Sequence, residues 1–241
     1  MLENVMRQLR VFEELVRARM QVDVAGMVAG VRARLESRLA LEALPVDADL
    51  VDKRGPAGWG RIATTAWQAP GFRKIVLSHV DMPPLIDGFA LVVLPLPRKA
   101  APVFAADLMA LPTRVSVNAD LYAAPSLHEV ARQALEPLGE SFARLESGGG
   151  PSWAQALSSG RGLHAKLTPR AVDDAFAGLN GALARALEVM GAAPEEGEVG
   201  AGAETQRLFF EAFHAHGPRK GPLGTIFGST WAERYSRLIF E

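Results

Sequence analysis

Asp107 is the residue in this sequence whose setting most suggests chemistry. If residues 103–110 form a strand, Asp107 shares one face with Val103, Ala105 and Met109, which are all apolar. Apolar surroundings raise the pKa of a carboxyl group, and a raised pKa lets it hold and deliver a proton near neutral pH. Asp107 is therefore a candidate proton donor. The alternative is a structural aspartate that is bonded to loop amides.

Other polar side chains give weaker signals. Asn118 and Asp120 lie with Ser116 on the polar face of another expected strand, where they either bind a ligand or face solvent. His214 and His216 have the spacing of a metal-binding pair. A third ligand is missing, so the end of a solvated helix is the better interpretation. We expect no bound metal.

The first half of the chain must supply a sheet that positions Asp107. Two amphipathic helices are predicted over residues 2–20 and 24–43. The apolar segment 89–94 predicts a central strand that is covered on both faces. Six short segments in this half are separated by Gly, Pro and Asp, and their spacing is too tight for helical crossovers. They span residues 47–55, 58–69, 72–81, 88–97, 102–110 and 114–122.

The second half is helical. Helices are predicted over 126–146, from an N-cap at Thr168 and Pro169 to about 190, and over 203–215 and 229–238. Helices before and after a sheet with two apolar faces predict an α/β fold. We expect a three-layer α/β/α sandwich with a central, mainly antiparallel sheet flanked by helices.

Composition excludes several classes of protein. The chain has 241 residues, of which 49% are apolar, with a net charge of −1 and no cysteine. The length suits one large domain, and the small net charge provides no strong electrostatic attraction for nucleic acid. The absence of cysteine excludes disulfides and thiolate metal ligands. The charged N-terminal segment does not look like a signal peptide. The longest apolar run has about half the length of a membrane-spanning helix, so we expect a cytoplasmic protein without membrane contact.

Four stretches resemble the ferredoxin-dependent bilin reductases, most closely the phycocyanobilin:ferredoxin oxidoreductase branch. They are QAPGFRKIVL, which ends at Leu77, and residues 94–108, 115–121 and 227–241, in the order of the family. The resemblance covers roughly residues 24–241. It implies a bilin reductase-like domain over 24–241 and an N-terminal helical extension over 1–23.

The resemblance implies a function. Members of this family have an α/β/α fold and bind biliverdin between the sheet and the C-terminal helices. They carry no bound cofactor and receive single electrons from an external [2Fe-2S] ferredoxin. Asp107 matches the aspartate of the family's F-x-x-D pattern, so we expect it to donate a proton in a two-electron reduction of biliverdin. The alternative is a non-catalytic bilin- or tetrapyrrole-binding protein with the same fold.

The sequence departs from that branch at two positions. Ser78 stands where the branch has a glutamate, and Ala90 stands where it has a histidine. These changes imply another regiospecificity, fewer transferred electrons or no catalysis. His216 falls near a family asparagine of the pocket. It either compensates as a proton donor or serves as a cation at a helix C-terminus.

Paired basic residues suit the acidic groups that the resemblance implies. We assign Arg73-Lys74 and Arg219-Lys220 to the bilin propionates, and Lys53-Arg54 and Arg98-Lys99 to docking of an acidic ferredoxin. Ser78, Ala90, Asn118 and Asp120 complete the expected substrate-binding set. We expect a monomer.

Overall fold

The centre of the protein is an antiparallel sheet. The computed structural model describes residues 22–83, 85–112, 114–145, 150–196, 200–216 and 222–240. Eight strands follow the order β1-β3-β4-β5-β6-β7-β8, with β2 also paired to β3, and all of these pairings are antiparallel. The strands are β1 (Glu42–Ala43), β2 (Asp52–Arg54), β3 (Arg61–Ala69), β4 (Phe72–Met82), β5 (Ile86–Pro95), β6 (Val103–Leu111), β7 (Arg114–Tyr122) and β8 (Leu163–Leu167).

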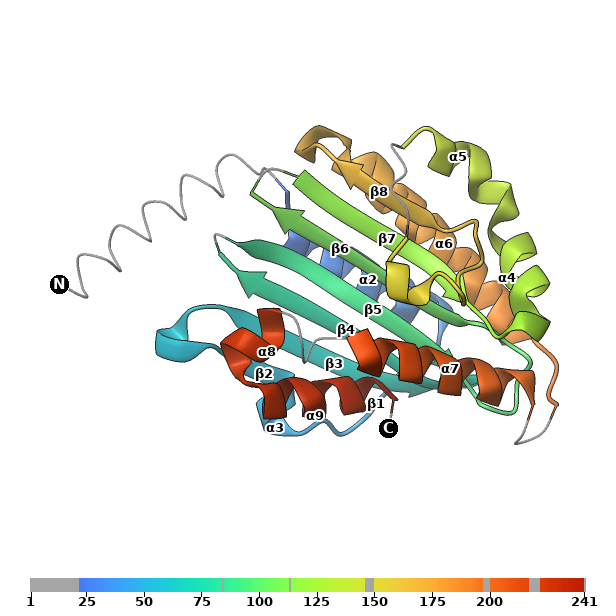
Figure 1. Ribbon diagram of the computed structural model, residues 1–241, viewed down its shortest axis with the longest axis horizontal. Helices are drawn as coiled ribbons and strands as arrows, with labels where there is room; N and C mark the ends of the chain where they lie inside the picture. Colours follow the sequence, from blue (N-terminus) through green and yellow to red (C-terminus); the bar gives the residue numbers. More distant parts are fainter. Residues whose placement is uncertain are drawn as a thin grey trace.

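Helices cover both faces of this sheet (Figure 1). On one face lie α2 and α6, and across the other lie α7, α8 and α9 (Figure 1). Each face has its own apolar cluster, which confirms the predicted three-layer sandwich. The helix bounds are α2 (Val24–Arg38), α3 (Ala48–Val51), α4 (His128–Leu135), α5 (Gly139–Ala143), α6 (Val172–Ala192), α7 (Ala201–His216), α8 (Pro222–Phe227) and α9 (Ser229–Phe240).

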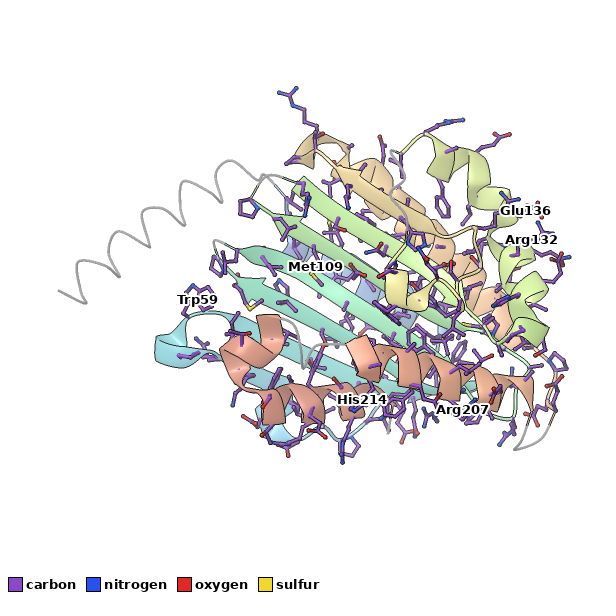
Figure 2. All side chains as sticks on the ribbon, in the orientation of Figure 1. Trp59, Met109, Arg132, Glu136, Arg207 and His214 are labelled. Carbon is purple, nitrogen blue, oxygen red and sulfur yellow. The ribbon has the colours of Figure 1, made fainter. Side chains whose placement is uncertain are left out.

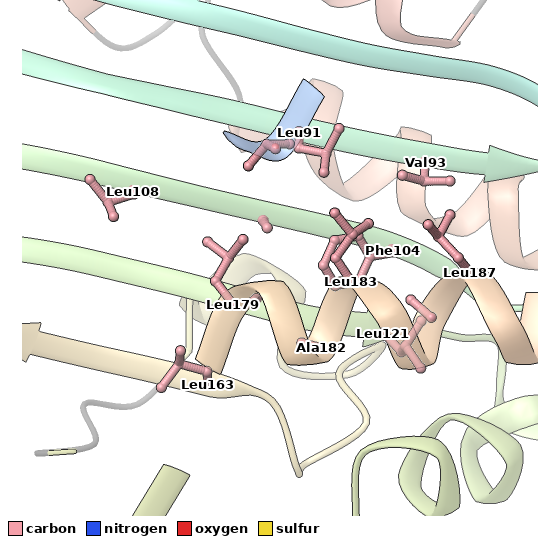
Figure 3. Packing of buried hydrophobic residues seen from close by; sticks show 14 of the residues in the cluster. Leu91, Val93, Phe104, Leu108, Leu121, Leu163, Leu179, Ala182, Leu183 and Leu187 are labelled. Carbon is pink, nitrogen blue, oxygen red and sulfur yellow. The ribbon is translucent and has the colours of Figure 1, made fainter. Parts of the chain in front are cut away.

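Helix α6 shows why the sequence forms the covering layer. Asp173 and Asp174 lie in its first turn, where negative charge is favourable, and Leu179, Leu183 and Leu187 form a buried stripe. In Figure 3 this stripe lies against apolar side chains of the central strands. The strand residues labelled there are Leu91, Val93, Phe104, Leu108, Leu121 and, on β8, Leu163.

Several element boundaries differ from the prediction. The second helix ends at Arg38 because Leu39 turns to an extended conformation, and the following residues form β1. The predicted helix over 126–146 is divided into α4 and α5 by a 3-10 turn at Glu136–Leu138, which contains Pro137. Proline lacks the amide hydrogen that a continuous helix needs. Neither β1 nor β8 was predicted, whereas 89–94 is central, as predicted.

Two other expectations meet the structure only in part. The helix predicted over 2–20, and with it most of the predicted 1–23 extension, lies outside the described residues. Thr168 precedes the expected helix, but its side chain makes no capping hydrogen bond, and Pro169 opens a short 3-10 turn before α6. Within the described part of the chain, no helix is both long and apolar enough to cross a membrane.

Candidate active site

A single row of directly opposed residues crosses the sheet on the face of α7–α9. Neighbouring strands place one residue each in this row, and side chains at opposed positions lie close enough to interact. The row contains Ser78, Ala90, Asp107 and Asn118, so register brings together four of the predicted site residues. Its full order is Thr64, Ser78, Ala90, Asp107, Asn118 and His164.

Asp107 lies in the middle of this row. It is partly exposed, whereas its chain neighbours Ala106 and Leu108 are buried on the opposite face. Met109, two residues along β6, lies on a part of the strand that helices α7, α8 and α9 leave uncovered in Figure 2. The alternation that the sequence predicted for β6 is therefore present. It directs the carboxyl group to a face that a ligand can reach.

Although part of the Asp107 side chain is exposed, protein atoms surround the carboxyl group closely, and this burial raises its pKa to about 6. Two neighbours oppose the effect: the hydrogen bonds from Asn118 and the charge of His164 both lower the pKa. The Nδ2 atom of Asn118 lies 3.0 Å from Oδ1 and 3.2 Å from Oδ2 of Asp107. Asp107 therefore has a side-chain partner on the next strand, β7. A carboxyl group with a pKa near 6 carries a usable proton close to neutral pH.

Ser78 belongs to the same row as Asp107, but other side chains cover it. The hydroxyl of Tyr235 on α9 donates a hydrogen bond of 2.7 Å to Ser78 Oγ, which also lies 3.1 Å from Oγ1 of Thr64. Ser78 is only 1% exposed, so α9 covers it. Ala90 is partly exposed between Ser78 and Asp107, and its methyl group can only contribute packing.

Replacing Tyr235 with phenylalanine should lower the free energy of unfolding by about 1 kcal/mol, because one buried hydrogen bond is lost while Ser78 keeps Thr64 as a partner. Urea denaturation measures the change. In a double-mutant cycle with Ser78→Ala, the two losses should not add, since both variants remove the same bond. Additive losses would show that the hydroxyls do not interact.

Asp120 faces protein donors. Its side chain is fully buried and accepts hydrogen bonds from the Leu121 amide at 2.7 Å, Ser158 Oγ at 2.5 Å and Ser159 Oγ. Nε2 of His164 lies 3.3 Å from its Oδ2. The predicted contact with a ligand would require these bonds to break, so the geometry gives Asp120 a structural role.

Arg73 and Lys74 lie away from the row. An irregularity in the β4 register between Phe72 and Lys74 lets both side chains line one cavity of about 520 Å³ beside α9. The Lys74 ammonium donates to the carbonyl of Leu238 at 2.9 Å. Burial lowers the pKa of the Arg73 guanidinium, and its Nε has no hydrogen-bond partner among the described residues. The pair therefore lies outside the row of Asp107, and its assignment to the bilin propionates stays a prediction.

Three cations assigned to partner docking have local contacts. Lys53 lies 2.6 Å from Asp49, and Arg98 lies 3.1 Å from Glu195. The Lys99 ammonium donates to the carbonyl of Gly191 at 2.5 Å, at the end of α6.

The remaining predicted residues fall where little is described. His216 is the last residue of α7, and its side chain is not described; Arg219 and Lys220 lie outside the described residues. The ring of His214 stacks on Phe210 with their centroids 5.6 Å apart. Among the described residues, no group of three or more His, Asp or Glu side chains could hold a metal ion.

His164 is the site residue that the sequence interpretation missed. Leu163, Ala165 and Leu167 are buried on one face of β8, while His164 and Lys166 point to the other. This period of two is a strand signal, but it covers only five residues after an irregular loop. Recognising β8 would have placed His164 on a polar face, although its register with Asn118 required the structure.

The fold is that of a known bilin reductase. Phytochromobilin synthase from tomato, solved in complex with biliverdin, is similar with a TM-score of 0.76 and 13% sequence identity, over 88% of this chain and 82% of that chain. The model of the ferredoxin-dependent bilin reductase family matches residues 28–241. The chain belongs to this family. No curated protein matches the sequence.

Proposed function

We propose that the protein binds biliverdin against the sheet face around Asp107 and reduces it with single electrons from ferredoxin and a proton from Asp107. The observation that carries the proposal is the partly exposed Asp107, whose pKa is raised to about 6 by burial, in a chain of the bilin reductase family. Within the proposed unit, residues 24–241, this carboxyl group lies at the middle of the sheet.

The surroundings of Asp107 suit a flat, largely apolar pigment. Aromatic side chains of the front layer, including Trp153, Phe213 and Phe227, are only partly buried and pack around the same apolar cluster as Ala105. Binding sites for such ligands are mostly apolar, with a few polar groups that fix orientation. Asp107 and Asn118 supply those polar groups in this proposal.

The row favours a two-electron reduction over a four-electron one. Saturating one double bond requires two electrons and two protons, and each further bond requires another pair of protons. Ala90 has no proton to give, and the Ser78 hydroxyl is closed off under Tyr235. Asp107 is therefore the acid of the row that can meet the pigment directly, and in this proposal it delivers one of the two protons while water delivers the other.

The electrons come from outside the chain in this proposal. The family depends on ferredoxin, and we infer an external [2Fe-2S] ferredoxin that docks on a cytoplasmic, monomeric protein. Two basic pairs were assigned to docking, and three of their four cations, Lys53, Arg98 and Lys99, have contacts within the protein. The fourth, Arg54, is exposed and is the best candidate for docking.

Biliverdin should bind at about one molecule per chain and without a covalent bond, because the sequence has no cysteine for thioether attachment. A titration followed by the visible absorbance of the pigment measures the binding, and denaturation should release all of it. A flat titration, or pigment that stays attached after denaturation, would contradict the proposal.

A matched pair of variants locates the binding face. Ala105 is partly exposed beside Asp107, so a tryptophan there should weaken binding at least about tenfold by filling the space. Ala33 is exposed on α2 in the opposite layer, and Ala33→Trp should leave the titration unchanged. Circular dichroism verifies that both variants are folded.

A further inference from the structure

Asn118 connects Asp107 to His164. Its Nδ2 atom donates to both carboxyl oxygens of Asp107, at 3.0 and 3.2 Å, and its Oδ1 atom lies 3.2 Å from Nδ1 of His164. An amide has a donor end and an acceptor end, so the two contacts are not independent. With the donor end toward Asp107, the acceptor end must face the histidine.

The other ring nitrogen of His164 also faces an acceptor. Nε2 lies 3.3 Å from Oδ2 of Asp120, whose carboxylate is fully buried and held by Leu121, Ser158 and Ser159. A histidine between two acceptors satisfies both only when it carries two protons. With the amide of Asn118 placed in this way, the contacts suit an ionised Asp107 and a histidine that donates from both ring nitrogens.

Protonating Asp107 reverses this pattern. A protonated carboxyl group can donate to Oδ1 of Asn118 once the amide turns over, and Nδ2 then points at Nδ1 of His164. That nitrogen must now accept, so the ring keeps a single proton, on Nε2 toward Asp120. Both arrangements satisfy all of these groups, and in each of them Asp107 and His164 together hold one exchangeable proton.

A cavity connects His164 to solvent. It has a volume of about 470 Å³, and His164, Tyr122, Ser158 and Gly162 form part of its wall. Exposed residues, Gln155, Gly160 and Arg161, complete that side. The His164 side chain is 11% exposed, so water in the cavity can exchange a proton with it. The titratable or charged groups that share the row, the strand face or the cavity with His164 are Asp107, Asp120, Tyr122, Arg161 and Lys166.

We propose that His164 is a positioning residue for Asp107, and that the amide of Asn118 makes the two groups alternate in protonation. The proposal rests on the proposed bilin reduction. When ferredoxin has supplied an electron, the O–H bond of Asp107 breaks and its proton passes to the pigment. Asn118 turns its Nδ2 atom to the new carboxylate, and Nδ1 of His164 takes one proton from water in the cavity. The total charge of Asp107 and His164 then stays constant, which avoids an uncompensated charge beside the pigment.

Carbon NMR of protein labelled with [13C]aspartate tests the coupling without pigment or ferredoxin. The Asp107 carboxyl signal is assigned by its loss in Asp107→Asn. In His164→Gln, which cannot titrate, its midpoint should rise by on the order of half a pH unit or more, because a protonated His164 no longer holds the donor end of Asn118 toward the carboxylate. By reciprocity, the imidazole nitrogen signals of His164 should titrate at lower pH in Asp107→Asn.

Asn118→Ala separates coupling through the amide from direct charge interaction. It should remove most of the mutual shift between Asp107 and His164, and a shift that persists unchanged would overturn the role of Asn118. His79→Gln is the matched control, because His79 also contacts a carboxylate, Asp87 at 2.9 Å, but outside the row. It should leave the Asp107 curve unchanged.

Two further results decide the proposal. If His164→Gln does not move the Asp107 midpoint, and the smaller His164→Asn does not either, the coupling is absent and the proposal fails. If the coupling is present but biliverdin does not bind, the proposed function fails while the proton exchange between the two residues remains. With pigment bound, His164→Gln should also change the shape of the pH profile of turnover. Loss of a purely structural residue would lower turnover by the same factor at every pH.

Discussion

Replacing Asp107 with asparagine should lower the rate of biliverdin reduction about a hundredfold or more while biliverdin still binds. Asparagine keeps the shape of the side chain and part of its hydrogen bonding to Asn118, but it has no acid proton to deliver. Losses of this size are usual when a general acid is removed. Anaerobic turnover with ferredoxin and a reducing system, followed by absorbance spectra, measures the rate.

Asp87→Asn is the matched control for this experiment. Asp87 is a partly exposed aspartate of the neighbouring strand β5, but its partner is His79, outside the row of Asp107. The control should retain the parental rate. Parental activity in Asp107→Asn would remove Asp107 from the mechanism. If the wild-type protein binds biliverdin but does not reduce it with any electron donor, the result would support the binding-only alternative.

Asp107→Asn should lower activity but raise the stability of the folded protein. The folded pKa of Asp107, about 6, lies above the unfolded value of 3.8, so the folded state binds more protons between these values. The free energy of unfolding therefore falls as the pH rises from about 4 to about 6. Asp107→Asn removes this loss, and above pH 6 it should be about 1–3 kcal/mol more stable than the wild type. Lower activity then cannot be attributed to misfolding.

Local sequence patterns were sufficient to predict much of the fold. The alternation along β6 placed Asp107 on the accessible face, and the doubly apolar segment 89–94 identified the central strand. Composition and turn residues also separated the sheet from the later helices. These features depend on neighbours within a few residues, which is the range over which periodicity acts.

The partners of the site residues depend on distant segments. Asn118 reaches Asp107 only in the observed register, and a shift of one residue would turn it to the other face. Tyr235, which covers Ser78, lies 157 residues further along the chain. Neither contact leaves a local signal, so the sequence pointed to Asp107 as a candidate but could not show which side chains lie beside it.

Asp120 provides the sharpest contrast with Asp107. Replacing Asp120 with alanine should lower the free energy of unfolding by about 3 to 5 kcal/mol, because the Leu121 amide and the hydroxyls of Ser158 and Ser159 lose their acceptor inside the protein. Asp120→Asn keeps one acceptor oxygen and should lose about 1 to 2 kcal/mol. Urea denaturation at pH 7 measures both changes.

Asp107→Ala is the control, since it removes a carboxylate on the adjacent strand of the same face. Ionised Asp107 costs stability because burial disfavours its charge, so at pH 7 its removal should not cause a loss of stability like that of Asp120→Ala. Asp120→Ala should also release Nε2 of His164 and so disturb the titration of Asp107. Equal losses of stability in the two alanine variants would show that Asp120 is not the structural anchor of this row, and would restore it as a candidate for binding the ligand.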